Sequence, residues 1–266
     1  METNLLIASL IGIFLLAGIS AKWSLPFKKA VIIISIAVLL SLISIVLILQ
    51  PIVNGLFLYI GYLLEQLLLY IIIILYLFFR DPQRNPPDDS TALVSPADGT
   101  VIYIKKLING ELISSKKKNS IMVYDELRNT TLAKYKLWQI GINLVLTDIH
   151  INRSPITGRV SLLLHKKGKF LSLRNKDAVN LNERQIILIE NESIVLAVIL
   201  IASRLVRRIE SYIVQDESVL MGEKIGMIKF GSQVDIFIPM DKVKEINVKV
   251  GDYIKAGESI IGKISK

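Results

Sequence analysis

The chain has 266 residues, of which 52% are hydrophobic, and its mean hydropathy is +0.52. This average excludes an ordinary soluble domain, so membrane-spanning segments have to be sought before a core. A formal net charge of +9 favours an anionic partner, either a membrane surface or a nucleic acid. The chain has no cysteine, which excludes disulfides and thiolate metal sites but does not select a compartment.

Three long apolar stretches open the chain, at residues 5–21, 30–49 and 55–79. Each is about long enough to cross a hydrocarbon core of roughly 30 Å at about 1.5 Å per helical residue. The first stretch has no basic segment before it and no small-residue cleavage site after it, which favours a retained helix over a signal peptide. We therefore predict a membrane region of about three spans at residues 1–79, followed by a second domain at residues 80–266.

The cations that flank these stretches lie after the first and after the third: Lys22, Lys28, Lys29, Arg80 and Arg84. The linker between the second and third stretches is uncharged. The positive-inside bias then predicts an external N-terminus and places everything after Arg80 in the cytoplasm. Prolines stop the third helix soon after Arg80, and both arginines are expected at the level of the lipid head groups.

Glu65 is the one acidic residue inside the third stretch, which makes it a candidate functional group. Two structural interpretations compete with a functional one. Glu65 and Gln66 can face a neighbouring helix, or they can mark a break between a surface segment and a shorter span. We favour a structural role for this pair.

From residue 92 onward the pattern favours β-strands. Short segments rich in β-branched residues alternate with Gly, Asn, Lys or Pro turns. Strands are predicted at residues 101–107, 120–124, 136–146, 158–164, 185–190, 194–202, 224–230 and 234–239. Residues 202–213 fit either a helix or a strand with a basic face. The predicted fold is therefore a set of N-terminal transmembrane α-helices followed by a mainly β cytoplasmic domain.

The chain contains two histidines, His150 and His165. His165 lies among lysines and is expected on the surface. His150 lies in DIHINRSPITG and shares strand parity with Asp148 and Asn152, so three polar side chains are expected on one face of a strand. A polar face in an apolar domain indicates a pocket.

The sequence GMIKFGSQVDIFIP, at residues 226–239, contains two extended segments separated by Gly231 and Ser232. Gly231 has no side chain, which leaves its carbonyl open to attack by the neighbouring Ser232 hydroxyl. For an arbitrary Gly-Ser pair in a strand, the ordinary interpretation is a β-bulge.

Three motifs in order resemble the phosphatidylserine decarboxylase family, in its short, archaeal-type form. FFRDPQRNPP followed by SPADG, which contains Asp98, is similar to the N-terminal part of that family's catalytic domain. DIHINRSPITG is similar to its D-x-H-x-x-x-x-P-x-x-G motif, although Arg153 stands where longer bacterial relatives have a second histidine. The run around Gly231 and Ser232 resembles the processing site, and the likeness covers about residues 78–239.

The resemblance implies that the chain cleaves itself between Gly231 and Ser232 into a beta chain, 1–231, and an alpha chain, 232–266. It implies that Ser232 becomes a covalent pyruvoyl group, the cofactor, which forms a Schiff base with the substrate amine. Asp98 and His150 are the candidates that accept the serine proton during cleavage. His150 is also the candidate that reprotonates the product, and no metal is implied. Outside the resemblance, the Ala-Asp-Gly that contains Asp98 is an ordinary turn.

The implied substrate is an anionic serine phospholipid, either phosphatidylserine or archaetidylserine, and the products are the ethanolamine phospholipid and CO₂. The implied partners are the membrane and the two cleaved chains, paired as a heterodimer. Basic residues gather in four clusters of the second domain: Lys105/Lys106, Lys116–Lys118, Lys166/Lys167/Lys169 and Arg204/Arg207/Arg208. Because no nucleic-acid motif accompanies these clusters, we predict a lipid partner and no nucleic acid.

The tail at residues 248–262 is similar to the V-x-x-G-D-x-V-x-x-G-x-x-I pattern of biotinyl and lipoyl domains, which makes the β domain barrel-sandwich-hybrid-like. This similarity supports an alternative function, a membrane-anchored carrier or adaptor without decarboxylase activity. In that alternative, Met227-Ile228-Lys229-Phe230 is a hairpin with a modifiable lysine.

Overall fold

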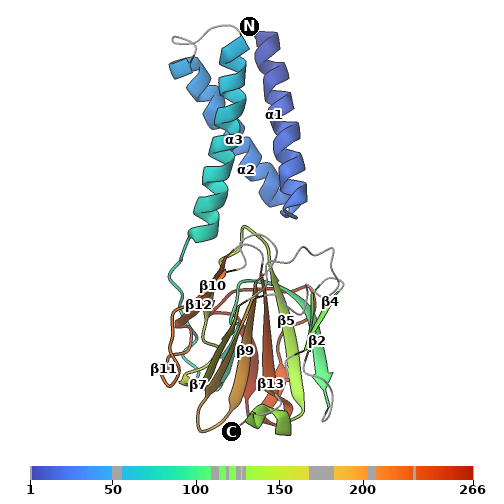
Figure 1. Ribbon diagram of the computed structural model, residues 1–266, viewed down its shortest axis with the longest axis vertical. Coiled ribbons are helices and arrows are strands. Elements are labelled where there is room, and N and C mark those ends of the chain that lie inside the picture. Colours follow the sequence, from blue (N-terminus) through green and yellow to red (C-terminus); the bar gives the residue numbers. More distant parts are fainter. Residues whose placement is uncertain are drawn as a thin grey trace. The chain divides into compact units, whose positions relative to one another are not determined.

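The computed structural model describes residues 2–49, 56–108, 114–117, 120–123, 127, 130–167, 183–202, 208–229 and 232–265 (Figure 1). Contacts divide the chain into two compact units, one helical and one built mainly from β-strands. The helical unit comprises Met1–Arg80 with Val145–Thr147, and the β unit comprises Asp81–Leu144 with Asp148–Lys266. Each unit has buried hydrophobic clusters of its own.

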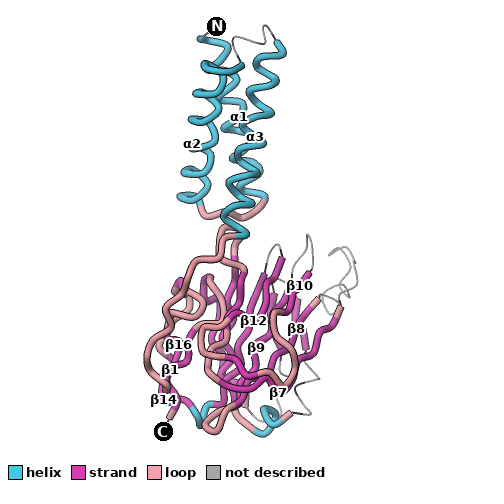
Figure 2. The backbone as a smooth tube through the Cα atoms, turned by 90° about the vertical axis from the view of Figure 1, so that its left-hand side faces the viewer, coloured by secondary structure: helices cyan, strands magenta, loops and turns pink. Residues whose placement is uncertain are grey.

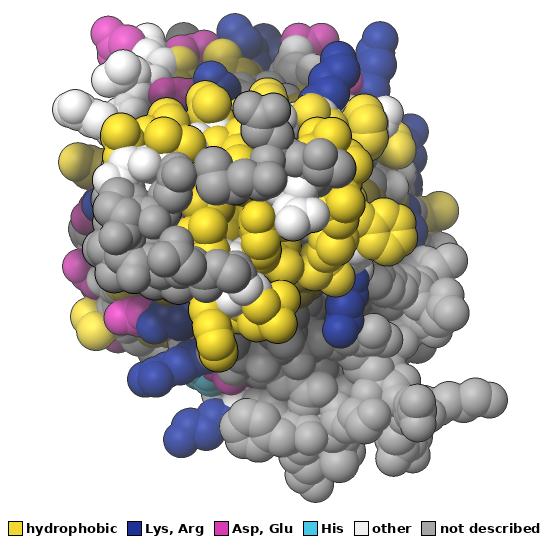
Figure 3. Space-filling view, turned by 90° about the horizontal axis from the view of Figure 1, so that it is seen from above, with side chains coloured by type: hydrophobic (Ala, Val, Ile, Leu, Met, Phe, Trp, Pro, Cys, Tyr) yellow, Lys and Arg dark blue, Asp and Glu magenta, His cyan; other side chains and the backbone are white. Residues whose placement is uncertain are grey.

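The described part of the helical unit contains three apolar helices, α1 (Glu2–Lys22), α2 (Phe27–Ser44) and α3 (Leu56–Phe79). α2 continues into a π-helical turn at Ile45–Leu49. All three are long and apolar enough to cross a membrane, which confirms the predicted apolar helices. Large hydrophobic side chains lie exposed on their outer faces, Phe14 at 81% among them, and Figure 3 shows such side chains gathered over this unit. A surface of this kind is typical of contact with lipid.

The buried face of α3 repeats every four residues: Leu58, Tyr62, Gln66, Tyr70, Ile74 and Phe78. This spacing forms one stripe along a helix. The Tyr62 hydroxyl lies 2.8 Å from Ser9 Oγ of α1. Gln66 packs closely on Gly12 of α1, so that a side chain at position 12 would overlap the Gln66 amide. The interpretation that Gln66 faces a neighbouring helix is therefore confirmed. The alternative of a break is wrong, because α3 continues unbroken through Glu65.

Eight of the described strands form one antiparallel sheet in the order β11-β7-β8-β9-β13-β5-β2-β15. Two smaller sheets have the orders β10-β12-β6 and β1-β16-β14, and β3 pairs with β4. Figure 2 shows β1, β14 and β16 grouped together, with β10 beside β12. The bounds are β1 (Ala92–Val94), β2 (Gly99–Leu107), β3 (Ser114–Lys117), β4 (Ser120–Val123), β5 (Leu137–Leu144), β6 (Ile151–Arg153), β7 (Gly158–Lys166), β8 (Arg184–Glu190), β9 (Val195–Ala202), β10 (Arg208–Ser211), β11 (Ser218–Val219), β12 (Lys224–Lys229), β13 (Ser232–Pro239), β14 (Val243–Ile246), β15 (Tyr253–Ile254) and β16 (Ile260–Ile264).

All eight predicted strands are present, with ends that differ by two residues or fewer. Within the undecided segment 202–213, residues 208–211 form a strand, β10. The prediction missed several strands of two to five residues, among them β1, β11, β14, β15 and β16, because so few residues do not display a clear alternating pattern.

The central strand β13 separates two hydrophobic clusters. Val234, Ile236 and Ile238 pack into the larger one, whereas Phe237 packs into a smaller one on the other face. This division follows from the two-residue period of a strand. Because β13 is paired with β9 on one side and β5 on the other, its register is specified twice.

Candidate active site

The Gly231–Ser232 bond lies between β12 and β13. Phe230, Gly231 and the side chain of Ser232 lie outside the described residues. The backbone of Ser232 begins β13, where it pairs with Leu144 of β5 and with Ala202 of β9. Residue 232 is therefore held in the sheet from both sides.

His150 lies beside the strand that leads to this bond. Ile228 in β12 lies three residues before Gly231, and its N–H donates to the His150 carbonyl at 3.2 Å. The imidazole is fully buried, and its Nδ1 lies 2.9 Å from the Asp148 carbonyl oxygen. A carbonyl can only accept, so Nδ1 carries the hydrogen and Nε2 is the nitrogen that can take up a proton.

The predicted strand around His150 is wrong in part. Asp148, Ile149 and His150 form an irregular loop, and β6 begins only at Ile151. The side chains of Asp148, His150 and Asn152 are all buried, and those of Ile149 and Ile151 are buried as well. The segment is enclosed on both sides, so a simple division into a polar and an apolar face does not hold.

The SPADG loop packs directly on this segment. The Pro96 carbonyl accepts the backbone N–H of Arg153 at 2.9 Å and the side-chain amide of Asn152 at 3.4 Å. The Ser95 hydroxyl closes the loop by donating to the Ala97 carbonyl at 2.7 Å. Two motifs that lie about fifty residues apart in the sequence are thus joined at their backbones.

Asp98 is 4% exposed and accepts three hydrogen bonds. One guanidinium nitrogen of Arg84 lies 2.9 and 2.8 Å from its two carboxylate oxygens, and the Ala256 N–H donates at 2.8 Å. Burial is the largest influence and raises the pKa of Asp98, and the nearby Asp148 carboxylate raises it further. The Ala256 N–H and Arg84 lower it by less, so the net shift is upward.

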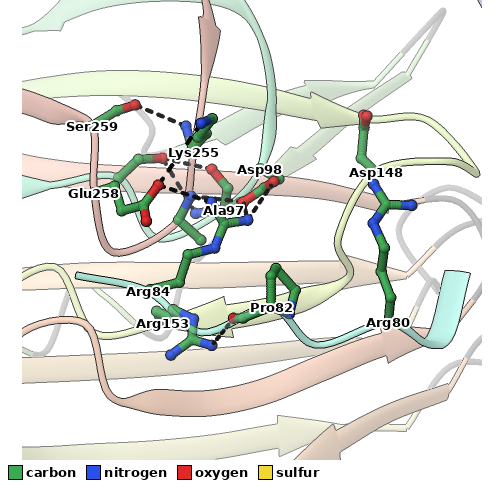
Figure 4. Close-up of polar contacts among 12 residues, drawn as sticks. Arg80, Pro82, Arg84, Ala97, Asp98, Asp148, Arg153, Lys255, Glu258 and Ser259 are labelled. Carbon is green, nitrogen blue, oxygen red and sulfur yellow. Dashed lines mark hydrogen bonds and ion pairs between the residues drawn. The ribbon is translucent and has the colours of Figure 1, made fainter. Parts of the chain in front are cut away.

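Arg84 does not lie where the sequence predicted, at the level of the lipid head groups. Its side chain is only 6% exposed, so it is not at a lipid surface. Figure 4 shows it between Asp98 and Glu258, and its second terminal nitrogen donates to Glu258 at 3.1 Å. The sequence reasoning missed both Arg84 and Glu258 as site residues. The available signal was the position of Arg84 in the same motif run as Asp98.

Arg153, at the position of the missing second histidine, makes a set of anchoring contacts. It donates to Asp81 at 3.0 Å and to the Gly222 carbonyl at 2.9 Å. Lys224, at the start of β12, also pairs with Asp81. A guanidinium stays protonated in proteins and cannot serve as a base. Arg153 therefore ties the segment after α3 to the turn before β12 and does not replace the histidine chemically.

The loop that carries Asp98 and the segment that carries His150 therefore lie next to each other. Asp98 contacts Arg84 and Ala256, and its loop reaches the His150 segment through Pro96. The Tyr253 hydroxyl of the tail donates to Asp148 at 3.0 Å. Across the described ranges, no group of three or more acidic or histidine side chains is arranged to hold a metal ion.

Gly99 is required by the shape of the Asp98 loop. Its φ is +154°, and a Cβ there would overlap the carbonyl oxygen of Asn143. We expect Gly99→Ala to lower the free energy of unfolding by about 1–3 kcal/mol, because backbone on both sides has to move. Thermal unfolding measures the loss. Gly251→Ala is the matched control, because its φ is also positive but its surroundings are open, and it should lose less. Equal losses in the two variants would contradict the steric argument.

Comparison with known proteins assigns the same region to one family. The family model described as phosphatidylserine decarboxylase matches residues 72–262. A phosphatidylserine decarboxylase proenzyme of Desulfotalea psychrophila is 34% identical over 188 residues, which cover 70% of this chain and 78% of the relative. One of Pelobacter propionicus is 36% identical over 188 residues, or 70% of this chain and 75% of the relative. A protein of Methanocaldococcus jannaschii named "Putative archaetidylserine decarboxylase proenzyme" is 37% identical over 187 residues, or 69% of this chain and 86% of the relative.

The matched region is wider than the likeness predicted from the motifs. It begins within α3 and includes the tail, whereas the first two helices lie outside it. The relatives match along most of their own length, so the agreement extends well beyond the three motifs. The resemblance inferred from the sequence is confirmed, and the chain belongs to the phosphatidylserine decarboxylase family.

Proposed function

We propose that this chain is a self-processing decarboxylase that converts a serine phospholipid to the ethanolamine phospholipid and CO₂. Its relatives carry the names of phosphatidylserine and archaetidylserine decarboxylase proenzymes. The proposal depends chiefly on one observation: in this member of the decarboxylase family, Ser232 occupies a fixed position in the sheet. It begins a strand paired on both sides, directly after a strand that contacts His150. The serine head group is common to both lipids, so the proposal covers either one.

In this proposal, Ser232 Oγ attacks the Gly231 carbonyl carbon while a nearby base takes its proton, so that an ester replaces the amide between residues 231 and 232. β-Elimination then releases the carboxylate of residue 231 and leaves dehydroalanine at 232, which water converts to the pyruvoyl group with loss of ammonia. His150 is the stronger candidate for that base, because its Nδ1 donates to the Asp148 carbonyl, which makes Nε2 the basic nitrogen of the ring. Asp98 is bound to Arg84 on both of its oxygens. Its role is therefore electrostatic, as a buried charge in the loop packed against the His150 segment.

The pyruvoyl group formed at residue 232 would supply an electron sink for the loss of CO₂. The surroundings fit such a group in two respects. The backbone of residue 232 is fixed by two neighbouring strands, and the fully buried His150 can deliver a proton without competing water. His150 would return that proton to the substrate carbon after CO₂ leaves.

The same proposal places the helices across the membrane and the β unit on the cytoplasmic side. Supporting features are the exposed apolar side chains of α1, α2 and α3 and the basic surface of the β unit. Lys105 and Lys106 are placed over the rings of Tyr103 and Trp138, at 4.8 and 4.9 Å. The predicted clusters at 116–118 and 204–207, and Lys169, lie where side chains are not described. The two cleaved chains would stay together as a heterodimer.

The alternative function, a carrier with a modifiable lysine hairpin, has less support. β12 pairs with β10 and β6, whereas β13 pairs with β9 and β5, so these two strands are not partners in a hairpin. Lys229 lies within β12 and forms an ion pair with Glu210 at 2.9 Å. We keep the barrel-sandwich-hybrid-like description of the β unit as a proposal.

Intact-mass spectrometry of the full chain, purified in detergent, tests the proposed function. We expect two polypeptides, residues 1–231 and 232–266, the second with a blocked N-terminus. The same preparation should release CO₂ from phosphatidylserine in mixed micelles. A single uncut chain that carries a modified lysine would instead support the carrier.

His150→Gln is expected to slow both self-cleavage and decarboxylation by about 10²–10⁴-fold, because glutamine cannot accept the proton. Self-cleavage is followed by intact mass over time, and decarboxylation as CO₂ released per cleaved chain. His165→Gln is the matched control, because His165 is partly exposed and pairs with Glu183, and it should leave both rates unchanged. If His150→Gln matched the wild type in both rates, His150 would have no catalytic role.

A further inference from the structure

A buried polar cluster lies on the face of β13 opposite the larger core, and the proposed reaction does not use it. Asp235 is fully buried and accepts hydrogen bonds from the Tyr103 hydroxyl at 2.6 Å and from the Gln139 amide at 2.7 Å. The Gln233 amide donates to Asp235 at 2.8 Å and to the Tyr103 oxygen at 2.9 Å. These four residues, here called the Asp235 cluster, join the neighbouring strands β2, β5 and β13.

Stability alone does not account for the Asp235 cluster. The same face of the sheet carries Leu137, Ile199 and Phe237, which pack in the smaller hydrophobic core. Taking a carboxylate out of water is costly, and well-packed apolar residues of similar volume are often as stabilising. The best attested use of such buried polar groups is to specify one pairing of the chain over others.

The contacts of the Asp235 cluster depend on the register of β13. Asp235 stands opposite Gly141 of β5, and the Tyr103 ring occupies the space that a side chain at Gly141 would need. A Cβ at Gly141 would lie 2.6 Å from Tyr103 Cε2. A slip of β13 by one residue would turn Asp235 toward the apolar core that holds Val234. The carboxylate would then lose its three donors.

From these contacts we infer that the Asp235 cluster is a register lock that positions residue 232, three residues earlier in the same strand. The inference rests on the proposed self-cleavage. Once the chain is cut, no covalent bond from β12 holds the start of β13. Tyr103 and Gln139 belong to the fragment 1–231, whereas Gln233 and Asp235 belong to 232–266. The cluster therefore spans the two fragments and keeps residue 232 in place at the start of β13.

Three variants test the register lock. Asp235→Asn removes the charge. The double variant Asp235→Asn with Gln139→Glu returns a carboxylate on the opposite side of the same hydrogen bond. An apolar variant replaces the whole cluster, with Tyr103→Phe, Gln139→Leu, Gln233→Leu and Asp235→Leu. Each is compared with Phe237→Leu, an apolar change on the same face of the same strand. The measurements are the thermal midpoint, the rate of self-cleavage by intact mass, and CO₂ released per cleaved chain.

We expect Asp235→Asn to cleave at least tenfold more slowly than Phe237→Leu, and the double variant to return to within about threefold of the wild type. The apolar variant should unfold near the wild-type temperature yet cleave at least tenfold more slowly. Wild-type cleavage in the apolar variant, or no recovery in the double variant, would overturn the register lock while leaving the proposed function intact. If the apolar variant does not fold, the comparison of the single and double variants decides alone. An uncut wild-type chain would overturn the proposed function, and the lock with it.

Discussion

Replacement of Ser232 with alanine is expected to leave a single uncut chain of 266 residues with no measurable decarboxylation. The variant lacks the hydroxyl that attacks the Gly231 carbonyl, so neither the cut nor the carbonyl cofactor can form. Without an electron sink, the reaction falls toward its uncatalysed rate, a loss of at least about 10⁶-fold. Denaturing electrophoresis and intact mass report the cut, and CO₂ release reports the reaction.

Ser193→Ala is the control for this experiment, because Ser193 lies in an exposed turn between β8 and β9. It should be cut and should act as the wild type does. The substitution removes only one hydroxyl group and leaves the backbone pairing of β13 intact. The Ser232→Ala chain should therefore unfold near the wild-type temperature. A Ser232→Ala protein that is still cut after residue 231 would rule out the serine as the nucleophile.

Arg84→Met is expected to cost the largest amount of stability, about 3–5 kcal/mol in the free energy of unfolding at neutral pH. Arg84 and Asp98 are both nearly inaccessible, with side chains 6% and 5% exposed. Removal of the cation leaves a buried carboxylate that keeps the Ala256 N–H as a hydrogen-bond donor. The loss is measured by denaturant unfolding of the full-length chain, from the transition in which the β unit unfolds.

The effect of Arg84→Met should depend on pH in a defined direction. The pKa of Asp98 is raised in the folded wild type, chiefly by burial, so the folded protein binds this proton more tightly than the unfolded chain. Loss of Arg84 removes a lowering influence and raises the pKa of Asp98 further. The deficit should therefore be fully present above that pKa and should shrink as the pH falls through it.

Two further variants separate the buried charge from general damage at this site. Adding Asp98→Asn to Arg84→Met removes the unpaired charge and should recover part of the lost stability and abolish the extra pH dependence. Lys224→Met removes a cation that is 47% exposed and should cost no more than about 1 kcal/mol. A pH-independent deficit in Arg84→Met would contradict a buried ion pair.

Local sequence determined much of this protein. Long apolar runs can hardly form anything but helices, and alternation revealed the strands of the large sheet, because both patterns repeat within a few residues. Candidate site residues such as Gly231, Ser232, His150 and Asp98 came instead from short runs that resemble motifs of a known family. The family followed from those runs, and it is confirmed by a match over residues 72–262.

Only the tertiary structure decided how these residues are partnered. Arg84 and Glu258 are 174 positions apart, and Asp235 meets Tyr103 across 132, so no local period links them. The charge of Arg84 predicted an exposed residue near lipid, but folding placed it against Asp98, where the carboxylate offsets the cost of burying it. Partners of this kind are selected by which strands become neighbours in space, and that depends on the whole chain.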